Sequence, residues 1–316
     1  MSGVLLDNQS ILEVLDSTSL YSPKRSDEKV VAFANCIYAL VLWENVYYCP
    51  RRTHTSNEYK IINSINSPFI KLENIDSETI YVENAYKIAM DYFSQYQNPA
   101  LQFQIQNAIY YVLLSTNHNI DVLLSKDRSD FLESSDIYKF LYSRRDIISL
   151  VDKEILQLYN EINNSLDKNI LKIQCPLFVD YICDNSATYK EAFNNALVLR
   201  NEPMVIDFRK AMSDMEHSLK TGNIIRFKQY IDIIPDIIHD LQSSGCKTTT
   251  INIDLSLTPS ITIPYVFKKK PKQMLHVKFI TELAKYGLYG KSLYEDFKNR
   301  IPPISPSFGA AFNTNT

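Results

Sequence analysis

The chain has few of the sequence signals that identify an enzyme. Only six glycines occur in 316 residues, which disfavours Gly-rich phosphate loops and glycine-heavy β architectures. The motifs of P-loop, dinucleotide-binding, HExxH zinc and GxSxG hydrolase sites are absent. The five histidines lie far apart, and none pairs with Cys or Asp at metal-ligand spacing. Sequence motifs therefore identify no catalytic constellation.

Targeting and membrane signals are missing too. The five cysteines are scattered, odd in number and never spaced as C-x-x-C, which indicates reduced thiols in a cytosolic protein. The first residues lack a basic segment and carry an acid early, so we predict no secretory signal. The longest apolar runs, such as ANCIYALVLW, are too short to span a bilayer. We expect a cytoplasmic protein without a membrane partner.

Charge is unevenly distributed along the chain. The net charge is −3, so no whole-protein field points to a nucleic-acid partner. Residues 265–300, however, hold nine Lys or Arg against three acids. Four of these lysines, Lys268, Lys269, Lys270 and Lys272, form a KKKPK run next to the aromatic residues Tyr265 and Phe267. This run is either a solvated loop that guards an edge strand or a grip for phosphates, and through it nucleic acid stays a candidate partner.

The hydrophobic pattern predicts a mostly helical α+β protein with a small N-terminal sheet element, a helical middle and a C-terminal β-hairpin. Hydrophobic residues make up 45% of the chain, enough for a substantial core. The hairpin is predicted from strict alternation that begins at Thr248 and ends at Ile263. Further strands are expected at 4–6, 46–48 and 120–124, and helices at 29–43, 77–96, 101–114 and 137–165.

A helical hairpin within residues 196–245 is the most clearly punctuated stretch. Asn223 is placed to cap its second helix, Gly245 to end it, and Pro235 predicts a kink or a break inside it. A boundary falls best at residues 163–169. It divides the chain into an N-terminal α/β and helical region, 1–165, and a C-terminal helical region with the hairpin, 166–316, unless the two form one continuous domain.

The first fifty residues resemble the beginning of PIN-like nucleases: a strand that ends at Asp7, two helices and a second strand. The resemblance implies three or four carboxylates that converge on Mg²⁺ or Mn²⁺. Asp7 would be the first, with Glu44, Asp121 and Asp127 as candidate partners. Otherwise Asp7 caps a turn and Glu44 is solvated. Outside this hypothesis we expect no cofactor and no metal site.

Four arginines are candidates for ligand binding: Arg128, Arg144, Arg200 and Arg209. Arg144 has acidic neighbours at Asp136, Asp146 and Asp152, which favour a surface ion pair over a ligand site. Arg200 and Arg209 fit either a ligand or a structural ion pair with Glu202 or Asp207, because the guanidinium fork matches a carboxylate.

The segment P-L-F-V-D-Y…A-L-V-L-R-N-E-P…I-D-F-R, from Pro176 to Arg209, resembles a motif in a group of bacterial proteins of unsettled function. The strand that ends at Asp7 and the piece 120–128 are similar to that group as well. The resemblance implies a setting in antiviral defence. Our leading hypothesis is a binding or regulatory subunit of a bacterial multiprotein assembly, with protein partners or self-association, and the metal-dependent nuclease is the alternative.

Overall fold

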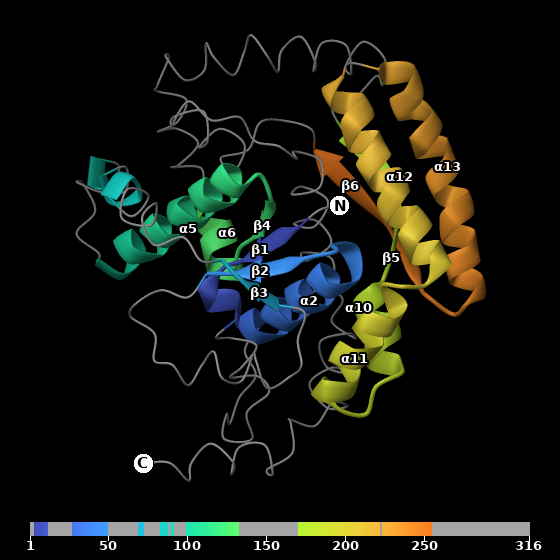
Figure 1. Ribbon diagram of the computed structural model, residues 1–316, viewed down its shortest axis with the longest axis horizontal. Helices are drawn as coiled ribbons and strands as arrows, with labels where there is room; N and C mark the ends of the chain where they lie inside the picture. The colour runs from blue at the N-terminus through green and yellow to red at the C-terminus, as the bar shows by residue number, and fades with distance from the viewer. Residues whose placement is uncertain are drawn as a thin grey trace.

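A computed structural model gives the fold of the chain (Figure 1). The structure describes residues 3–11, 27–49, 69–72, 83–87, 90–91, 99–132, 170–221 and 223–254. The predictions for residues 137–165, Arg144, the second strand of the hairpin and the lysine run lie outside these ranges. Within them, the prediction of a mostly helical α+β protein is confirmed.

A parallel sheet of four strands forms the N-terminal part of the fold. Its strand order is β3 (Phe69–Lys71), β2 (Val46–Tyr48), β1 (Val4–Leu6) and β4 (Asp121–Leu123). The strands predicted at β1, β2 and β4 are confirmed, and Val4 lies beside Val46 on one side and Asp121 on the other. This order is that of one half of a doubly wound sheet, in which the winding reverses between β1 and β4.

Helices cover both faces of this sheet, which explains why its central strand is apolar at every position. Val4 and Leu6 join the core formed with α2 (Asp27–Leu42). Leu5 points the other way, into a second core with α5 (Pro99–His118). All three side chains of β1 are fully buried. A parallel sheet that is buried on both sides needs such continuous apolar runs rather than alternation.

Helix α2 links the sheet to the C-terminal half of the described chain. It packs on α10 (Phe178–Asp184), α11 (Tyr189–Leu199) and α12 (Pro203–Lys220). Aromatic contacts mark the seam: the ring centroids of Phe33 and Phe193 are 5.5 Å apart, and those of Tyr38 and Phe178 are 6.4 Å apart. The larger core therefore runs across the predicted boundary, and the regions 1–165 and 166–316 share it.

The predicted helical hairpin is present as α12 and α13 (Ile224–Ser243) at one side of the molecule (Figure 1). The Asn223 side chain accepts a hydrogen bond from the Arg226 N–H at 3.1 Å and caps α13 as predicted. Gly245 follows the helix with φ +94°, a conformation that favours glycine. No helix in the described ranges combines the length and the apolar character that crossing a membrane requires.

The last described strand, β6, pairs with a strand that the local sequence pattern does not predict. Strand β6 (Thr248–Asp254) pairs antiparallel with β5 (Ile170–Pro176), in a register that sets Thr248 opposite Pro176. Ile173, Ile251 and Ile253 bury one face of the pair, as the alternation predicts. The sequence predicts a hairpin partner just after β6 at 261–263, outside the described residues, whereas β5 comes from far earlier in the chain.

Pro235 lies inside α13, which continues through it rather than breaking there. Proline has no N–H, so the carbonyl of Ile231 loses its helical hydrogen bond. Pro235 is on the exposed side of the helix, where water can hydrate that carbonyl. This placement lets the helix tolerate the residue.

Replacing this proline should stabilise the protein. We expect Pro235→Ala to raise the free energy of unfolding by about 1–3 kcal/mol, because alanine restores the hydrogen bond and removes the clash of the ring. Urea denaturation followed by far-UV circular dichroism measures the change. Asp236→Ala, at the exposed neighbour, is the control and should stay within about 0.5 kcal/mol of wild type. An unchanged or lower stability of Pro235→Ala would contradict this account.

Candidate functional site

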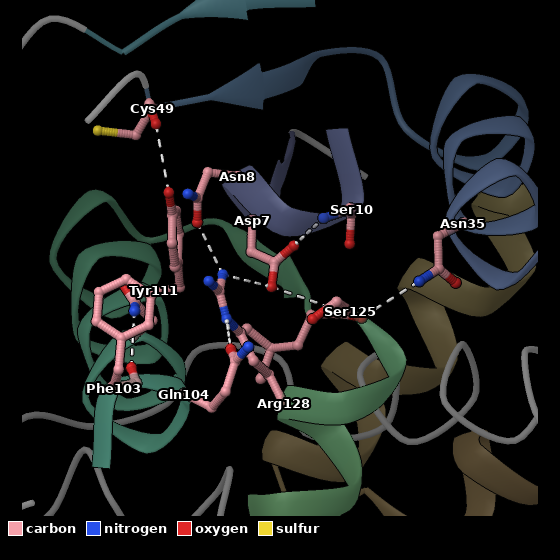
Figure 2. Close-up of polar contacts among 12 residues, drawn as sticks. Asp7, Asn8, Ser10, Asn35, Cys49, Phe103, Gln104, Tyr111, Ser125 and Arg128 are labelled. Atoms are coloured by element: carbon pink, nitrogen blue, oxygen red, sulfur yellow. Dashed lines mark hydrogen bonds and ion pairs between the residues drawn. The ribbon is translucent and has the colours of Figure 1, made fainter. Parts of the chain in front are cut away.

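Asp7 lies directly after β1, at the carboxyl edge of the parallel sheet. Its backbone N–H donates to the carbonyl of Leu123 at 3.2 Å and extends the ladder between β1 and β4. One carboxylate oxygen accepts from the Ser10 N–H at 2.7 Å, so Asp7 caps the helical turn 8–11. The other accepts from the Ser125 N–H at 3.0 Å, in the turn after β4 (Figure 2). One side chain thus holds two turns together.

Arg128, a second candidate from the sequence, pairs with this carboxylate. Its Nη1 donates to Asp7 Oδ2 at 2.9 Å and to Asn8 Oδ1 at 2.8 Å. Its Nε donates to Gln104 Oε1 at 3.1 Å, and its guanidinium carbon lies 5.6 Å from the centroid of the Tyr111 ring. Figure 2 shows Arg128 rising from α6 (Lys126–Leu132) between the Asp7 turn and the residues of α5. Asp7 is 0% exposed and Arg128 2% exposed, so the ion pair is fully buried.

This arrangement limits the chemistry of Asp7. Three N–H donors, one of them a cation, already occupy its carboxylate. A divalent ion bound to Asp7 would therefore lie close to the positive charge of Arg128, which disfavours its binding. Burial, and after it the negative charge of Asp7, raises the pKa of the nearby Cys36 thiol to about 12. The cysteine therefore stays protonated at neutral pH and supplies no thiolate nucleophile.

Two of the other candidate carboxylates, Asp121 and Glu44, lie away from Asp7. Asp121 begins β4 at the opposite end of the sheet, where it lies beside Val4 and accepts from Trp43 Nε1 at 2.6 Å. Glu44 precedes β2 at that same end. Asp127 is next to Arg128 in the first turn of α6. In the part of the chain that the structure describes, no group of three or more His, Cys, Asp or Glu is placed to hold a metal ion.

Arg200 and Arg209 lie at that opposite end and bind carbonyl groups. Arg200 Nη2 donates to the carbonyls of Trp43 and Glu44 at 2.9 and 2.7 Å, just after α2 ends. Arg209 Nη2 donates to the carbonyl of Arg200 at 3.0 Å. Burial lowers the pKa of both guanidinium groups, and the charge of Glu44 acts in the opposite direction. The two arginines therefore tie the α11–α12 turn to α2 and do not use the carboxylates of Glu202 or Asp207 in the predicted way.

Several polar residues of the carboxyl edge carry no sequence signal. Ser10 and Ser125, which donate backbone N–H groups to the Asp7 carboxylate, are buried, and so is Asn35 of α2. Among the residues that the structure describes, none forms a hydrogen bond with Ser10 Oγ, Asn35 Oδ1 or Ser125 Oγ. Asn35 Nδ2 donates to the carbonyl of Leu124 at 3.2 Å, which fixes α2 to the turn after β4. Buried oxygens of this kind are normally satisfied by water or a ligand.

The remaining site candidates lie outside the described residues: Arg144, Lys268, Lys269, Lys270 and Lys272.

Comparison with protein-family models, with curated proteins and with solved structures gives no match for this chain. What the candidate site can do therefore rests on its geometry.

Removing one member of the buried pair should be costly. We expect Asp7→Asn and Arg128→Met each to lower the free energy of unfolding by about 3 kcal/mol or more, because each leaves a buried group without its partner. The double variant should lose less than the sum of the two single losses. Chemical denaturation of the four proteins measures this coupling.

Lys126→Ala provides the matched control. Lys126 forms an ion pair with Asp130 on the same short helix, but that pair is partly exposed. Its loss should cost less than about 1 kcal/mol. Strict additivity of the Asp7 and Arg128 variants would show that the pair is not coupled in solution.

Proposed function

We propose that this protein is a cytoplasmic binding subunit of a protein assembly, and that it docks its partner on the outer face of α13. The main support for this proposal is that large apolar side chains are exposed to solvent on this helix and its neighbour. Ile225 on α13 is 76% exposed, and Ile233 on the same helix and Ile206 on α12 are each 44% exposed. Ile225 and Ile233 lie on the same helix, and large aliphatic side chains that are exposed there favour an interface over a solvated face.

The charges of α13 also support a partner. Arg226 and Lys228 are exposed near its start, while Asp236 and Asp240 are exposed near its end. This order opposes the helix dipole, which favours acids at the start and bases at the end. A partner with the reverse charge order, including a second copy of the chain packed antiparallel, compensates both ends. The face thus combines apolar anchors with charges that set an orientation.

The carboxyl edge of the sheet supports a role without chemistry. Its central carboxylate is already paired with a cation and capped by two backbone N–H groups. A place in antiviral defence is the part of the proposal that rests on the sequence resemblance alone.

The docking face can be tested with two isoleucine variants. We expect size-exclusion chromatography with light scattering to show a complex, either of the chain with itself or with the products of neighbouring genes. Ile225→Ser and Ile233→Ser should each raise its dissociation constant about tenfold or more, since interface anchors contribute over about 1 kcal/mol. Phe103→Ser is the matched control, because Phe103 is 53% exposed on α5, away from this face. The proposal would be wrong if the chain stays a monomer and binds none of the products of neighbouring genes. It would also be wrong if all three variants change the dissociation constant equally.

The nuclease is the second candidate, and one observation favours it. Asp7 lies at the carboxyl end of β1, next to the point where the winding of the sheet reverses, and α/β proteins bind ligands in that position. The chemistry needs further carboxylates, and its metal ion would have to bind beside the positive charge of Arg128. These requirements place it behind the binding role.

Cleavage assays separate the two candidates. RNA and DNA oligonucleotides are incubated with Mg²⁺ or Mn²⁺ and with one of three proteins: wild type, Asp7→Asn or Asp207→Asn. The last variant is the control, because Asp207 is an exposed carboxylate. A nuclease centred on Asp7 loses cleavage in Asp7→Asn alone, while the binding role predicts no cleavage by any of the three. Near-UV circular dichroism confirms that each variant is folded. Equal cleavage by all three proteins would exclude a centre at Asp7.

A further inference from the structure

A pocket of about 390 Å³ lies among the C-terminal helices, and the sequence candidate Arg200 stands between two of its lining residues, Leu199 and Glu202. It opens where the ends of α10, α11 and α13 meet the start of α12. Its volume falls in the range of small-ligand sites. The residues that matter for its chemistry are Asn185, Asn195, Glu202, Leu241 and Cys246.

The inner wall of the pocket is apolar. Ile182, Leu199, Leu241 and Cys246 line it and are all buried. Burial raises the pKa of the Cys246 thiol to about 12, so this residue lines the pocket as a neutral group. Met204 and Val198 continue the apolar surface outward. The wall suits a short hydrocarbon body.

The rim offers hydrogen-bond acceptors. Asn185 Nδ2 donates to the carbonyl of Tyr181 at 2.7 Å, and Asn195 Nδ2 donates to the carbonyl of Asn185 and to Ser186 Oγ, both at 2.9 Å. These contacts use the side-chain N–H groups and leave the amide oxygen of each asparagine as an acceptor. Glu202 is exposed at the rim and adds a carboxylate.

The local electrostatics favour a positive charge. Helices α11 and α13 end at the pocket, and neither has a basic residue in its last turn. Helix carboxyl ends carry partial negative charge. Two basic residues that are next to lining residues in the sequence have partners of their own, since Lys247 pairs with Asp184 at 3.2 Å and Arg200 donates to the carbonyls after α2.

We propose that this pocket binds a small organic cation, an ammonium or guanidinium group on a short apolar body. The body lies against Leu241 and Cys246, and the cation donates to Glu202 and to the amide oxygens of Asn185 and Asn195. This binding does not depend on the docking face of α13 or on any chemistry at Asp7.

Three probes with one shared body test the charge preference. Phenethylammonium, neutral 2-phenylethanol and 3-phenylpropanoate are titrated into the full chain by ligand-observed NMR. We expect saturable binding of the ammonium, at least tenfold weaker binding of the alcohol and no binding of the carboxylate. Equal binding of all three, or no binding of the ammonium, overturns the proposal.

Variants at the rim locate the site. Glu202→Gln should weaken ammonium binding about tenfold, since the amide oxygen still accepts a hydrogen bond but the negative charge that strengthens it is lost. Val198→Trp should also weaken it by filling the entrance, and Val198 is 62% exposed, so the fold tolerates the change. Asp207 is an exposed residue of α12 that does not line the pocket, so Asp207→Asn should leave binding unchanged. If Asp207→Asn weakens binding as much as Glu202→Gln, the cation is held by surface charge alone and the proposal fails.

Discussion

The buried ion pair between Asp7 and Arg128 is the constraint on which the carboxyl edge of the sheet depends. Taking two charges out of water is costly, so such a pair persists only when geometry and further hydrogen bonds satisfy both partners. Here Ser10 and Ser125 donate backbone N–H groups to the carboxylate, while Asn8 and Gln104 accept from the guanidinium. These contacts join β1, β4, α5 and α6 at one point. The ion pair between Arg128 and Asp7 fixes the position of α6 against this edge of the sheet.

Arginine solves a similar problem at the other end of the sheet. The carbonyls that follow α2 need donors, because the last turn of a helix leaves its C=O groups without helical partners. Arg200 provides two N–H contacts from the α11–α12 turn, and Arg209 supports the carbonyl of Arg200. Residues that stand out in the sequence as ligand-binding candidates thus hold distant segments together. Their guanidinium groups donate to backbone carbonyls of the protein itself.

Local pattern was sufficient for much of the fold. Apolar runs identified the strands at Val4 and Val46, and Asn223 and Gly245 marked the limits of α13 because capping and left-handed turns act within a few residues. The pairing of β6 with β5 joins segments far apart in sequence, which no local period reveals. The Asp7–Arg128 pair was missed for the same reason: both residues were candidates, but for different sites. Treating β1 and β4 as parallel neighbours would have brought the residues after each strand to one edge.

The position of α2 has a consequence for synthesis of the chain. This helix is made early, yet one of its sides is covered by α10, α11 and α12, which follow much later. At roughly 5–20 residues per second, the ribosome releases those helices on the order of ten seconds or more after α2. During that interval Phe33 and Tyr38 lack the aromatic partners they have in the finished core. The N-terminal sheet therefore cannot complete its packing as it emerges, and the nascent chain has to be kept from aggregating until the second half arrives.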